Sequence, residues 1–218
     1  MKRKDLLELI EKGENLTCEF KRKFSTHEKI AKEMIAFANT RGGVILFGVD
    51  DDKEIIGVES EKTEATLIEE TANEYCEPPL EYQIEFIDVK GKEIVVVNIP
   101  ESNNKPHRIQ DYENDFDITK ATVLIRVNDK SMQASKEMIR IMRAESADLK
   151  LKKYSIGPNE KNVFHYLEEN EIITVKDLSD LVNISTRRAS RTLVKMVRAN
   201  LLAIHTKENG EEYFTSRA

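Results

Sequence analysis

Residues 36–51 read AFANTRGGVILFGVDD and join the end of a predicted helix to a predicted strand. Upstream, Glu28–Asn39 places its apolar residues at helical spacing, which indicates one buried face. Gly42-Gly43 ends that helix, because glycine readily adopts the left-handed backbone of a helix stop. Val44–Val49 is apolar on both faces, so we expect it to lie at the centre of a sheet.

The elements on either side of this stretch alternate between helical and strand patterns. We expect helices at Asp5–Lys12, Glu64–Tyr75 and Ser135–Lys152, and strands at Leu16–Phe20, Glu54–Val58, Tyr82–Val89, Glu93–Ile99 and Thr122–Val127. Pro100–Asp117 is expected to be a long polar loop. Because the connections between the strands are mixed, the pattern predicts an α+β domain with a mixed sheet.

A different pattern follows Ser155-Ile156-Gly157-Pro158, which indicates a linker. We therefore expect a domain at 1–148, a linker at 149–158 and a second domain at 159–218. The second domain is expected to hold three capped helices: Glu160–Glu169 after Asn159, Val175–Val182 after Thr174, and Thr186–Ala199 after Ser185. Leu201–His205 and Glu212–Thr215 flank Asn209-Gly210, a pair that accepts positive φ at both turn positions of a hairpin. Three helices and a β-hairpin are typical of a winged helix-turn-helix.

The charge of the chain is unevenly distributed along its 218 residues. Residues 150–218 carry 12 Lys/Arg and 9 Asp/Glu, whereas residues 1–149 carry 22 and 31. This asymmetry predicts two modules with different partners, and the basic C-terminal module is the better candidate for contact with a polyanion.

Several classes of protein are excluded by composition. Apolar runs such as Val44–Val49 are far shorter than the about 20 residues that cross a bilayer, and the N-terminus lacks a signal-peptide pattern. Two cysteines, Cys18 and Cys76, and four histidines do not make a disulfide framework or a convincing structural zinc site. We expect a cytoplasmic protein with no membrane partner.

The third helix of the second domain, Thr186–Ala199, has a basic face and no acidic residue. Its cations are Arg187, Arg188, Arg191, Lys195 and Arg198, and Lys207 follows in the hairpin. Two arginines in the first turn oppose the helix dipole at about 0.3–1 kcal/mol each, which favours a polyanion at this end. In a helix-turn-helix this helix enters the major groove, so we expect duplex DNA as the partner and a homo-oligomer that reads two half-sites. The alternative is a solvated helix in a domain that contacts protein.

Four strings of the first domain share a pattern: GENLTCEFK at 13–21, residues 36–51, IPES at 99–102 with KPHR at 105–108, and IRVN at 125–128. Together they resemble the Schlafen-type AlbA-like domain, and the most specific part is Ala-Phe-Ala-Asn-Thr-x-Gly-Gly. Bacterial and archaeal members often join this domain to a winged helix and are catalogued as DNA-binding transcriptional regulators. The resemblance therefore implies a regulator whose first domain binds a ligand, a partner or nucleic acid.

The resemblance also implies a second hypothesis, an enzyme. In Schlafen proteins this domain can be a metal-dependent endoribonuclease with two glutamates separated by four residues and a later aspartate. Glu14 and Glu19 match that spacing, and Asp50 or Asp51 stands where the aspartate would lie. With Glu14, Glu19 and Asp50 holding Mg²⁺ or Mn²⁺, such a site would cleave RNA. The structural alternative is that these acidic residues are solvated strand ends.

Other basic residues are candidates for contact with nucleic acid or a ligand. Lys21 lies on the strand face of Glu19 and begins a basic stretch that continues through Lys29, Lys32 and Arg41. The long loop adds Lys105, His107 and Arg108, whose structural alternative is a surface connection stiffened by prolines. The Gly-Lys-Ser/Thr of a P-loop is absent, so Gly42-Gly43 predicts a turn. A nucleotide-binding or protein-interaction adaptor is the third hypothesis.

Overall fold

A computed structural model describes residues 1–113, 115–147 and 154–217. It divides the chain into two compact units, Met1–Gln133 and Ala134–Ala218. Helix α4 (Lys136–Ser146) falls in the second unit, whereas the sequence placed it at the end of a first domain that reached residue 148. The predicted end of this helix at Lys152 lies outside the described residues, as does most of the predicted linker.

The first unit is built on a four-stranded sheet with the order β1-β2-β5-β4. The strands are β1 (Cys18–Lys21), β2 (Gly43–Phe47), β4 (Gln83–Val89) and β5 (Lys92–Ile99). β1 runs parallel to β2, and the other two pairs are antiparallel. The α+β class with a mixed sheet is therefore confirmed, and β2 lies inside the sheet as its apolar faces predicted.

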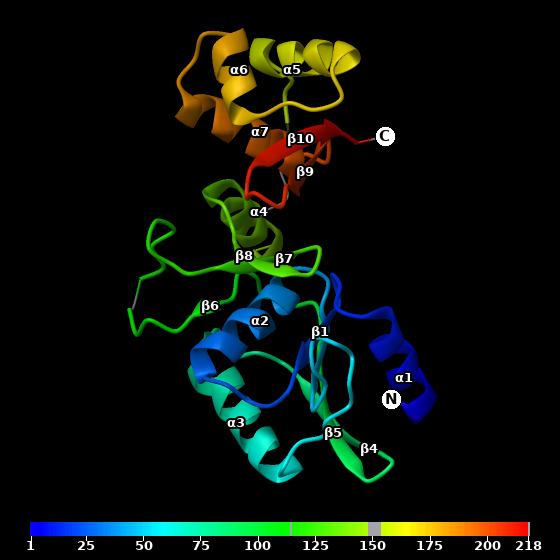
Figure 1. Ribbon diagram of the computed structural model, residues 1–218. Coiled ribbons are helices and arrows are strands. Elements are labelled where there is room, and N and C mark those ends of the chain that lie inside the picture. Colours follow the sequence, from blue (N-terminus) through cyan, green and yellow to red (C-terminus); the bar gives the residue numbers. More distant parts are fainter. Residues whose placement is uncertain (114, 148–153, 218) are drawn as a thin grey trace. The chain divides into compact units, whose positions relative to one another are not determined.

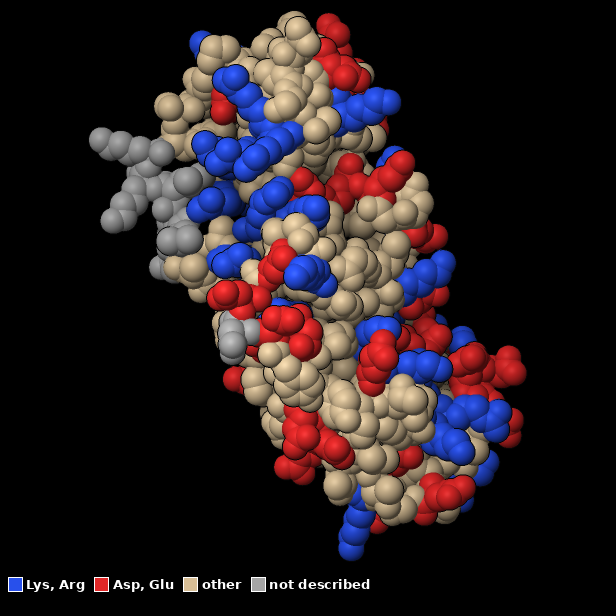
Figure 2. Space-filling model, turned by 90° about the vertical axis from the view of Figure 1, so that its left-hand side faces the viewer, with Lys and Arg blue, Asp and Glu red and all other residues tan. Residues whose placement is uncertain are grey.

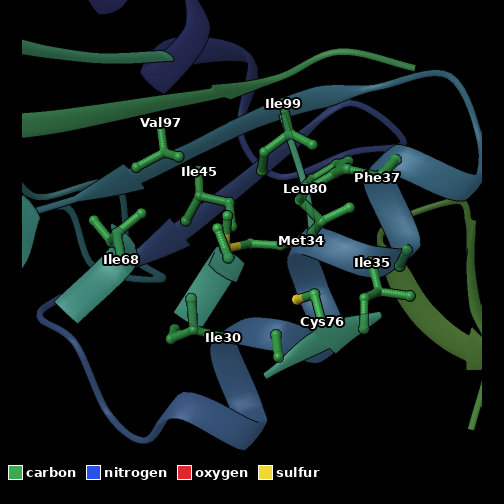
Figure 3. Packing of buried hydrophobic residues seen from close by; sticks show 14 of the residues in the cluster. Ile30, Met34, Ile35, Phe37, Ile45, Ile68, Cys76, Leu80, Val97 and Ile99 are labelled. Atoms are coloured by element: carbon green, nitrogen blue, oxygen red, sulfur yellow. The ribbon is translucent and has the colours of Figure 1, made fainter. Parts of the chain in front are cut away.

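Helices cover both faces of this sheet (Figure 1). α2 (His27–Asn39) and α3 (Glu61–Glu74) pack on one face, and α1 (Arg3–Lys12) packs on the other. Figure 3 shows the larger core, where side chains of α2 meet Ile45, Val97 and Ile99 of the sheet. The smaller core joins Leu6 and Ile10 of α1 to the opposite face. Burial on both faces explains why β2 and β5 are almost wholly apolar.

The two glycines where the chain passes from α2 into β2, Gly42 and Gly43, have different roles. Gly42 has φ +71°, and a Cβ there would lie 2.6 Å from the Ile99 carbonyl oxygen. At Gly43 a Cβ would overlap the ring of Phe37. The pair is therefore required by backbone conformation at one position and by close packing at the other, and both requirements are structural.

Two short antiparallel ladders complete this unit. β3 (Cys76–Glu77) pairs with β6 (Arg108–Ile109), and β7 (Leu124–Val127) pairs with β8 (Lys130–Gln133). The predicted long loop thus contains a strand, and β8 was not predicted. The expected strand Glu54–Val58 is wrong: the structure has only an isolated bridge between Val49 and Ile55 there.

Asn39, at the end of α2, ties these ladders to the helix. Its side chain accepts a hydrogen bond from the His107 N–H (2.8 Å) and donates to the carbonyls of His107 (2.8 Å) and Leu124 (3.0 Å). Asn39 is buried, so these three bonds satisfy backbone groups that water does not reach.

The second unit holds α4, three further helices and a hairpin. The helices are α5 (Pro158–Glu169), α6 (Val175–Leu181) and α7 (Thr186–Arg198), and the strands are β9 (Leu202–Thr206) and β10 (Glu212–Ser216). A core that includes Leu178, Leu193 and Phe214 joins them. In the described part of the chain, no helix is long and apolar enough to cross a membrane.

Of the helix caps and the hairpin turn predicted for this unit, some are confirmed and others are wrong. Thr174 and Ser185 cap α6 and α7 as predicted. The cap predicted at Asn159 is wrong, because α5 begins at Pro158, two residues before the predicted start at Glu160, with Gly157 as its N-cap. In the hairpin, Gly210 has φ +85° whereas Asn209 is not in the left-handed region, so the predicted turn with two positive φ values is also wrong.

We expect Asn39→Leu to lower the free energy of unfolding by about 3 kcal/mol or more, since it leaves three buried backbone groups unpaired at about 1–3 kcal/mol each. Urea unfolding of the purified variant measures this loss. Asn103→Leu, at an exposed position, is the matched control and should change stability by less than about 0.5 kcal/mol. Equal stability of the two variants would contradict the proposed role of Asn39.

Candidate nucleic-acid interface

A basic groove lies between α4 and α7 within the second unit. Its volume is about 580 Å³, and the described residues that line it include no Asp or Glu. The lining side chains are Arg140, Arg143, Ala144, Ala147, Arg187, Arg191, Val194, Lys195 and Arg198. Figure 2 shows Lys and Arg side chains gathered on this face of the unit. We call this feature the α4–α7 groove.

The amphipathic sequence of α7 places the cations in the groove. Ala189, Leu193 and Met196 are buried in the core of the unit, which turns the basic face of the helix outward. Arg187, Arg191 and Lys195 follow at four-residue intervals, so their side chains share one stripe and line the same groove. These three residues and Arg188 are exposed, and Arg198 is half-buried.

Arg140 and Arg143 of α4 form the opposite wall of the groove, and the sequence analysis missed them. The sequence pattern that could have indicated Arg140 and Arg143 is their three-residue spacing, which places both on one side of an amphipathic helix. It was not used because α4 was assigned to the first domain, where a groove shared with α7 was not expected.

One carboxylate holds α4 against α7. Oε1 of Glu137 accepts a hydrogen bond from the Ser190 hydroxyl and another from Arg140 Nη1 (3.2 Å). Arg140 Nη1 also lies 3.2 Å from Ser190 Oγ. Ser190 is buried, and it is a polar residue on α7 that serves helix packing rather than the outer basic face.

The remaining two predicted DNA contacts lie outside the lining of the groove. Arg188 is exposed in the first turn of α7. Lys207 follows β9, with its Nζ 3.4 Å from Glu211 Oε2 and 5.9 Å from the ring centre of Tyr213. Both side chains reach solvent, so both remain candidates for a separate contact.

The predicted metal ligands of the first unit are already occupied by protein groups. Oε1 of Glu14 accepts a hydrogen bond from the Phe20 N–H (2.8 Å), and burial raises the pKa of this carboxyl above its usual value. Glu19 is buried and pairs with Lys21 through one oxygen and with Arg126 through the other (3.0 Å). Its carboxylate is neutralised from both sides.

Arg126, on β7, is the centre of this buried network. Besides Glu19, its guanidinium contacts Glu33 Oε2 (3.0 Å) and the Asn15 carbonyl (2.8 Å). It lies 4.6 Å from the ring centre of Phe37. One buried cation thus connects β7 to β1 and α2. Its ion pairs give Glu19 and Glu33 a structural role.

The aspartates of the predicted metal site also have structural surroundings. Oδ1 of Asp50 accepts hydrogen bonds from the N–H groups of Asp52 (3.1 Å) and Glu54 (2.9 Å), which closes a turn. Asp51 is exposed, although its charge acts on Glu14. Across residues 1–113, 115–147 and 154–217, no three His, Cys, Asp or Glu side chains form a group that could hold a metal ion. The structure therefore does not assemble the expected ligands Glu14, Glu19 and Asp50 into such a group.

The basic stretch of the first unit surrounds a second pocket, of about 450 Å³. Lys21, Arg22, Lys29 and Lys32 line it, as the sequence analysis expected of one face. Glu33 and Asp51 line it too, and Lys32 pairs with Glu28. This pocket has mixed charge, whereas the described lining of the α4–α7 groove has one sign.

The loop residues predicted to contact a ligand are held by contacts within the first unit. His107 is 3% exposed; its Nδ1 lies 2.8 Å from the Pro78 carbonyl oxygen and its Nε2 2.7 Å from Ser102 Oγ. Arg108 is also 3% exposed and pairs with Glu77 and Asp111. Lys105 pairs with Glu101 and donates to the Thr40 carbonyl. Arg108 is held by these ion pairs, whereas His107 lines a pocket of about 170 Å³ together with Ser102. Contact of His107 or Arg108 with a ligand stays a prediction.

The family model described as Schlafen, AlbA_2 matches residues 14–135, which is more than half of the chain. The chain therefore belongs to the Schlafen AlbA_2 family. The match ends next to the boundary between the two units, so the α4–α7 groove lies outside it.

Two solved structures show low similarity to this chain. The N-terminal domain of a RecG-related protein from Nitrosomonas europaea is 21% identical, with a TM-score of 0.39, over 51% of this chain and 81% of that chain. The DIP2311 protein from Corynebacterium diphtheriae is 19% identical, with a TM-score of 0.41, over 60% of this chain and 28% of that chain. No curated protein matched the chain.

We expect Arg126→Met to destabilise the protein by about 3–5 kcal/mol, because the buried carboxylate of Glu19 and the half-buried carboxylate of Glu33 lose their shared cation. Denaturant unfolding measures the change. Arg22→Met removes the same charge from an exposed position and should leave stability within about 0.5 kcal/mol of the parent protein. A loss below about 1 kcal/mol for Arg126→Met would show that the network is dispensable.

Proposed function

We propose that this protein is a DNA-binding transcriptional regulator that contacts duplex DNA through its C-terminal unit. The observation that carries the proposal is the α4–α7 groove, in which six cations from two helices line one surface with no carboxylate among the described lining residues. Bringing like charges together costs free energy in the unbound protein, and a polyanion repays that cost by displacing its own counterions.

The second unit supports this role through its architecture. Three helices and a hairpin follow α4 in the order of a winged helix-turn-helix, with α7 as the recognition helix and β9–β10 as the wing. We assign the groove residues to phosphate contacts, which position the protein without reading sequence. Arg188, exposed on α7 outside the groove, is our candidate for contact with a base edge, and Lys207 for a phosphate contact by the wing.

The family domain is assigned a supporting role in this proposal, as a module that binds a ligand or partner. Its acidic residues are paired within the unit, and its basic pocket includes carboxylates. We do not propose a ribonuclease, because Glu19 is occupied by Arg126 and Lys21. Duplex readers of this type pair on two half-sites, so we propose a homo-oligomer acting in the cytoplasm.

Replacing Arg187, Arg191 and Lys195 together by Ala should weaken binding to duplex DNA and flatten its salt dependence. Each lost phosphate contact reduces the slope of log K against log salt by about 1, so the triple variant should lose about 3. Titration of labelled duplex at several salt concentrations measures both quantities. The matched control replaces Lys62, Lys161 and Arg217, three exposed cations outside the groove, and should retain the parental slope. Parental binding by the groove variant would refute the assignment of α7.

Replacing Arg140 and Arg143 by Ala tests whether α4 belongs to the same surface. We expect the salt slope to fall by about 2 and affinity to fall by a similar factor for all duplex sequences, because phosphates are common to every sequence. The control pair is Lys161 and Arg217. Structured RNA is titrated in parallel. If the protein binds the RNA more tightly than the duplex, RNA rather than duplex DNA is the partner of this surface.

A further inference from the structure

A small pocket in the first unit brings a serine and a histidine together. Ser102 follows the end of β5 at Ile99, and His107 directly precedes β6. Their side chains are in hydrogen-bond contact, with Ser102 Oγ 2.7 Å from His107 Nε2. The other ring nitrogen of His107, Nδ1, lies 2.8 Å from the Pro78 carbonyl oxygen. A hydroxyl, an imidazole and a backbone acceptor thus form a continuous line of hydrogen bonds.

The Pro78 carbonyl fixes the tautomer of His107. A carbonyl oxygen only accepts, so Nδ1 carries a proton and donates it to Pro78. In the neutral ring Nε2 is then an acceptor, and the Ser102 hydroxyl donates to it. Burial lowers the pKa of His107 below its usual value and Lys105 acts in the same direction, against the smaller opposing effects of the Pro78 hydrogen bond and of Glu81. The ring is therefore neutral at pH 7, which is the state that can accept a proton.

The end of α2 holds both residues in place. The Ser102 N–H donates to the Ala38 carbonyl (2.9 Å), and the His107 N–H donates to the Asn39 side chain (2.8 Å). The Asn104 N–H donates to Ser102 Oγ (3.0 Å), and a donor at that position stabilises negative charge as it develops on the oxygen. The serine and the histidine are thus fixed before a ligand arrives, which is a requirement for efficient reaction between bound groups.

The pocket makes the pair accessible from solvent. Its volume is about 170 Å³, and both Ser102 and His107 line it. Several exposed residues line it as well, namely Pro79, Glu81, Pro100, Glu101, Asn103 and Asn104. The described lining carries two carboxylates and no Lys or Arg, which favours an uncharged ligand over an anion. A cavity of about 150 Å³ holds a molecule the size of benzene, so this pocket suits a small ligand.

We propose that Ser102 and His107 form an acyl-transfer site that hydrolyses small, uncharged carboxylic esters. Ser102 is the nucleophile and His107 is the general base, whereas Pro78 and Asn39 position His107. A nucleophile in contact with a base that a third group orients is the arrangement that nucleophilic catalysis requires. A serine that only fastened the loop would need no access to solvent. Because all these residues belong to the first unit, the inference is independent of the function proposed above.

The reaction runs in two steps. Ser102 Oγ bonds to the carbonyl carbon of the ester and its proton moves to His107 Nε2; the bond from that carbon to the alcohol oxygen then breaks, and the alcohol leaves with the proton. Water next attacks the acyl group and gives a proton to Nε2, which returns it to Ser102 Oγ as the acid leaves. Water is the only co-reactant. Pro78 supplies a dipole where a carboxylate stands in a Ser-His-Asp triad, so we expect slower turnover than such triads show.

Methanesulfonyl fluoride tests the nucleophile in the full-length protein. Ser102 Oγ bonds to sulfur, fluoride leaves and the proton passes to His107, so peptide mass mapping should find one methanesulfonyl group on Ser102. Ser102→Ala should remove this label, whereas Ser25→Ala, at an exposed serine of the same unit, should retain it. Loss of a general base slows a reaction about 10²–10⁴-fold, and we expect that reduction in the labelling rate of His107→Gln. His165→Gln, at an exposed histidine, should label at the parental rate.

The pH profile of labelling separates an activated serine from an ordinary one. The rate should be independent of pH above the usual histidine value of 6.5 and should fall at lower pH, because only neutral His107 accepts the proton and its pKa is lowered. An ordinary serine would react faster with every rise in pH, as its alkoxide becomes more abundant. Hydrolysis of 4-nitrophenyl acetate, followed by absorbance, should show the same profile and should be lost in Ser102→Ala.

A parent protein without the label on Ser102 would overturn the proposal. Labelled Ser102 without ester hydrolysis would overturn it too, because the acyl group must also leave the site. Equal labelling rates in the parent protein and in folded His107→Gln would refute the role of the base. If circular dichroism shows that His107→Gln does not fold, Ser102→Ala and the pH profile of the parent protein decide: a rate that rises through pH 6.5 to pH 9 without a plateau refutes the site.

Discussion

Coulomb repulsion within the α4–α7 groove is the constraint under which the C-terminal unit folds. Six cations line that surface, and no Asp or Glu is among the described residues of its lining. The compensating charge is Glu137, which lies at the contact between the helices and is fixed by Ser190 and Arg140. Helix packing and the basic surface therefore depend on the same carboxylate, and displacement of α4 would alter both.

In the N-terminal unit, by contrast, charged side chains of opposite sign pair with one another. The buried Arg126 pairs with the buried Glu19 and the half-buried Glu33, and Lys21 completes the pairing of Glu19. Such buried pairs are costly to break, because a carboxylate left alone in a low-dielectric environment has no solvent to stabilise it. Some acidic residues of this unit are therefore paired within it, and others are solvated. The basic side chains of the α4–α7 groove are more accessible to a charged partner than the paired charges of the N-terminal unit.

Most local signals were predicted well, because they depend on neighbours in the chain, although the cap at Asn159 and the turn at Asn209-Gly210 were wrong. Ser185 and Thr174 cap their helices as expected, and the two segments predicted to flank Asn209-Gly210 match β9 and β10 nearly to the residue. Errors arose where a partner lies far along the chain. β6 has two residues and forms only because β3 lies beside it, and no local pattern announces such a strand. Asn39 was noted as part of a motif, but its bonds to His107 and Leu124 required the folded chain.

The sequence by itself determined the helices, the mixed sheet around residues 43–47 and the basic face of α7, since hydrophobic periodicity and capping are properties of short segments. Only the tertiary structure decided that His107 and Arg108 are buried, that Glu19 is paired with Arg126, and that α4 supplies the second wall of the groove. The physical reason is that burial and charge pairing depend on which surfaces meet. Which surfaces meet is decided by the packing of segments that are distant in the sequence. Such contacts produce no recognisable periodic pattern within either segment.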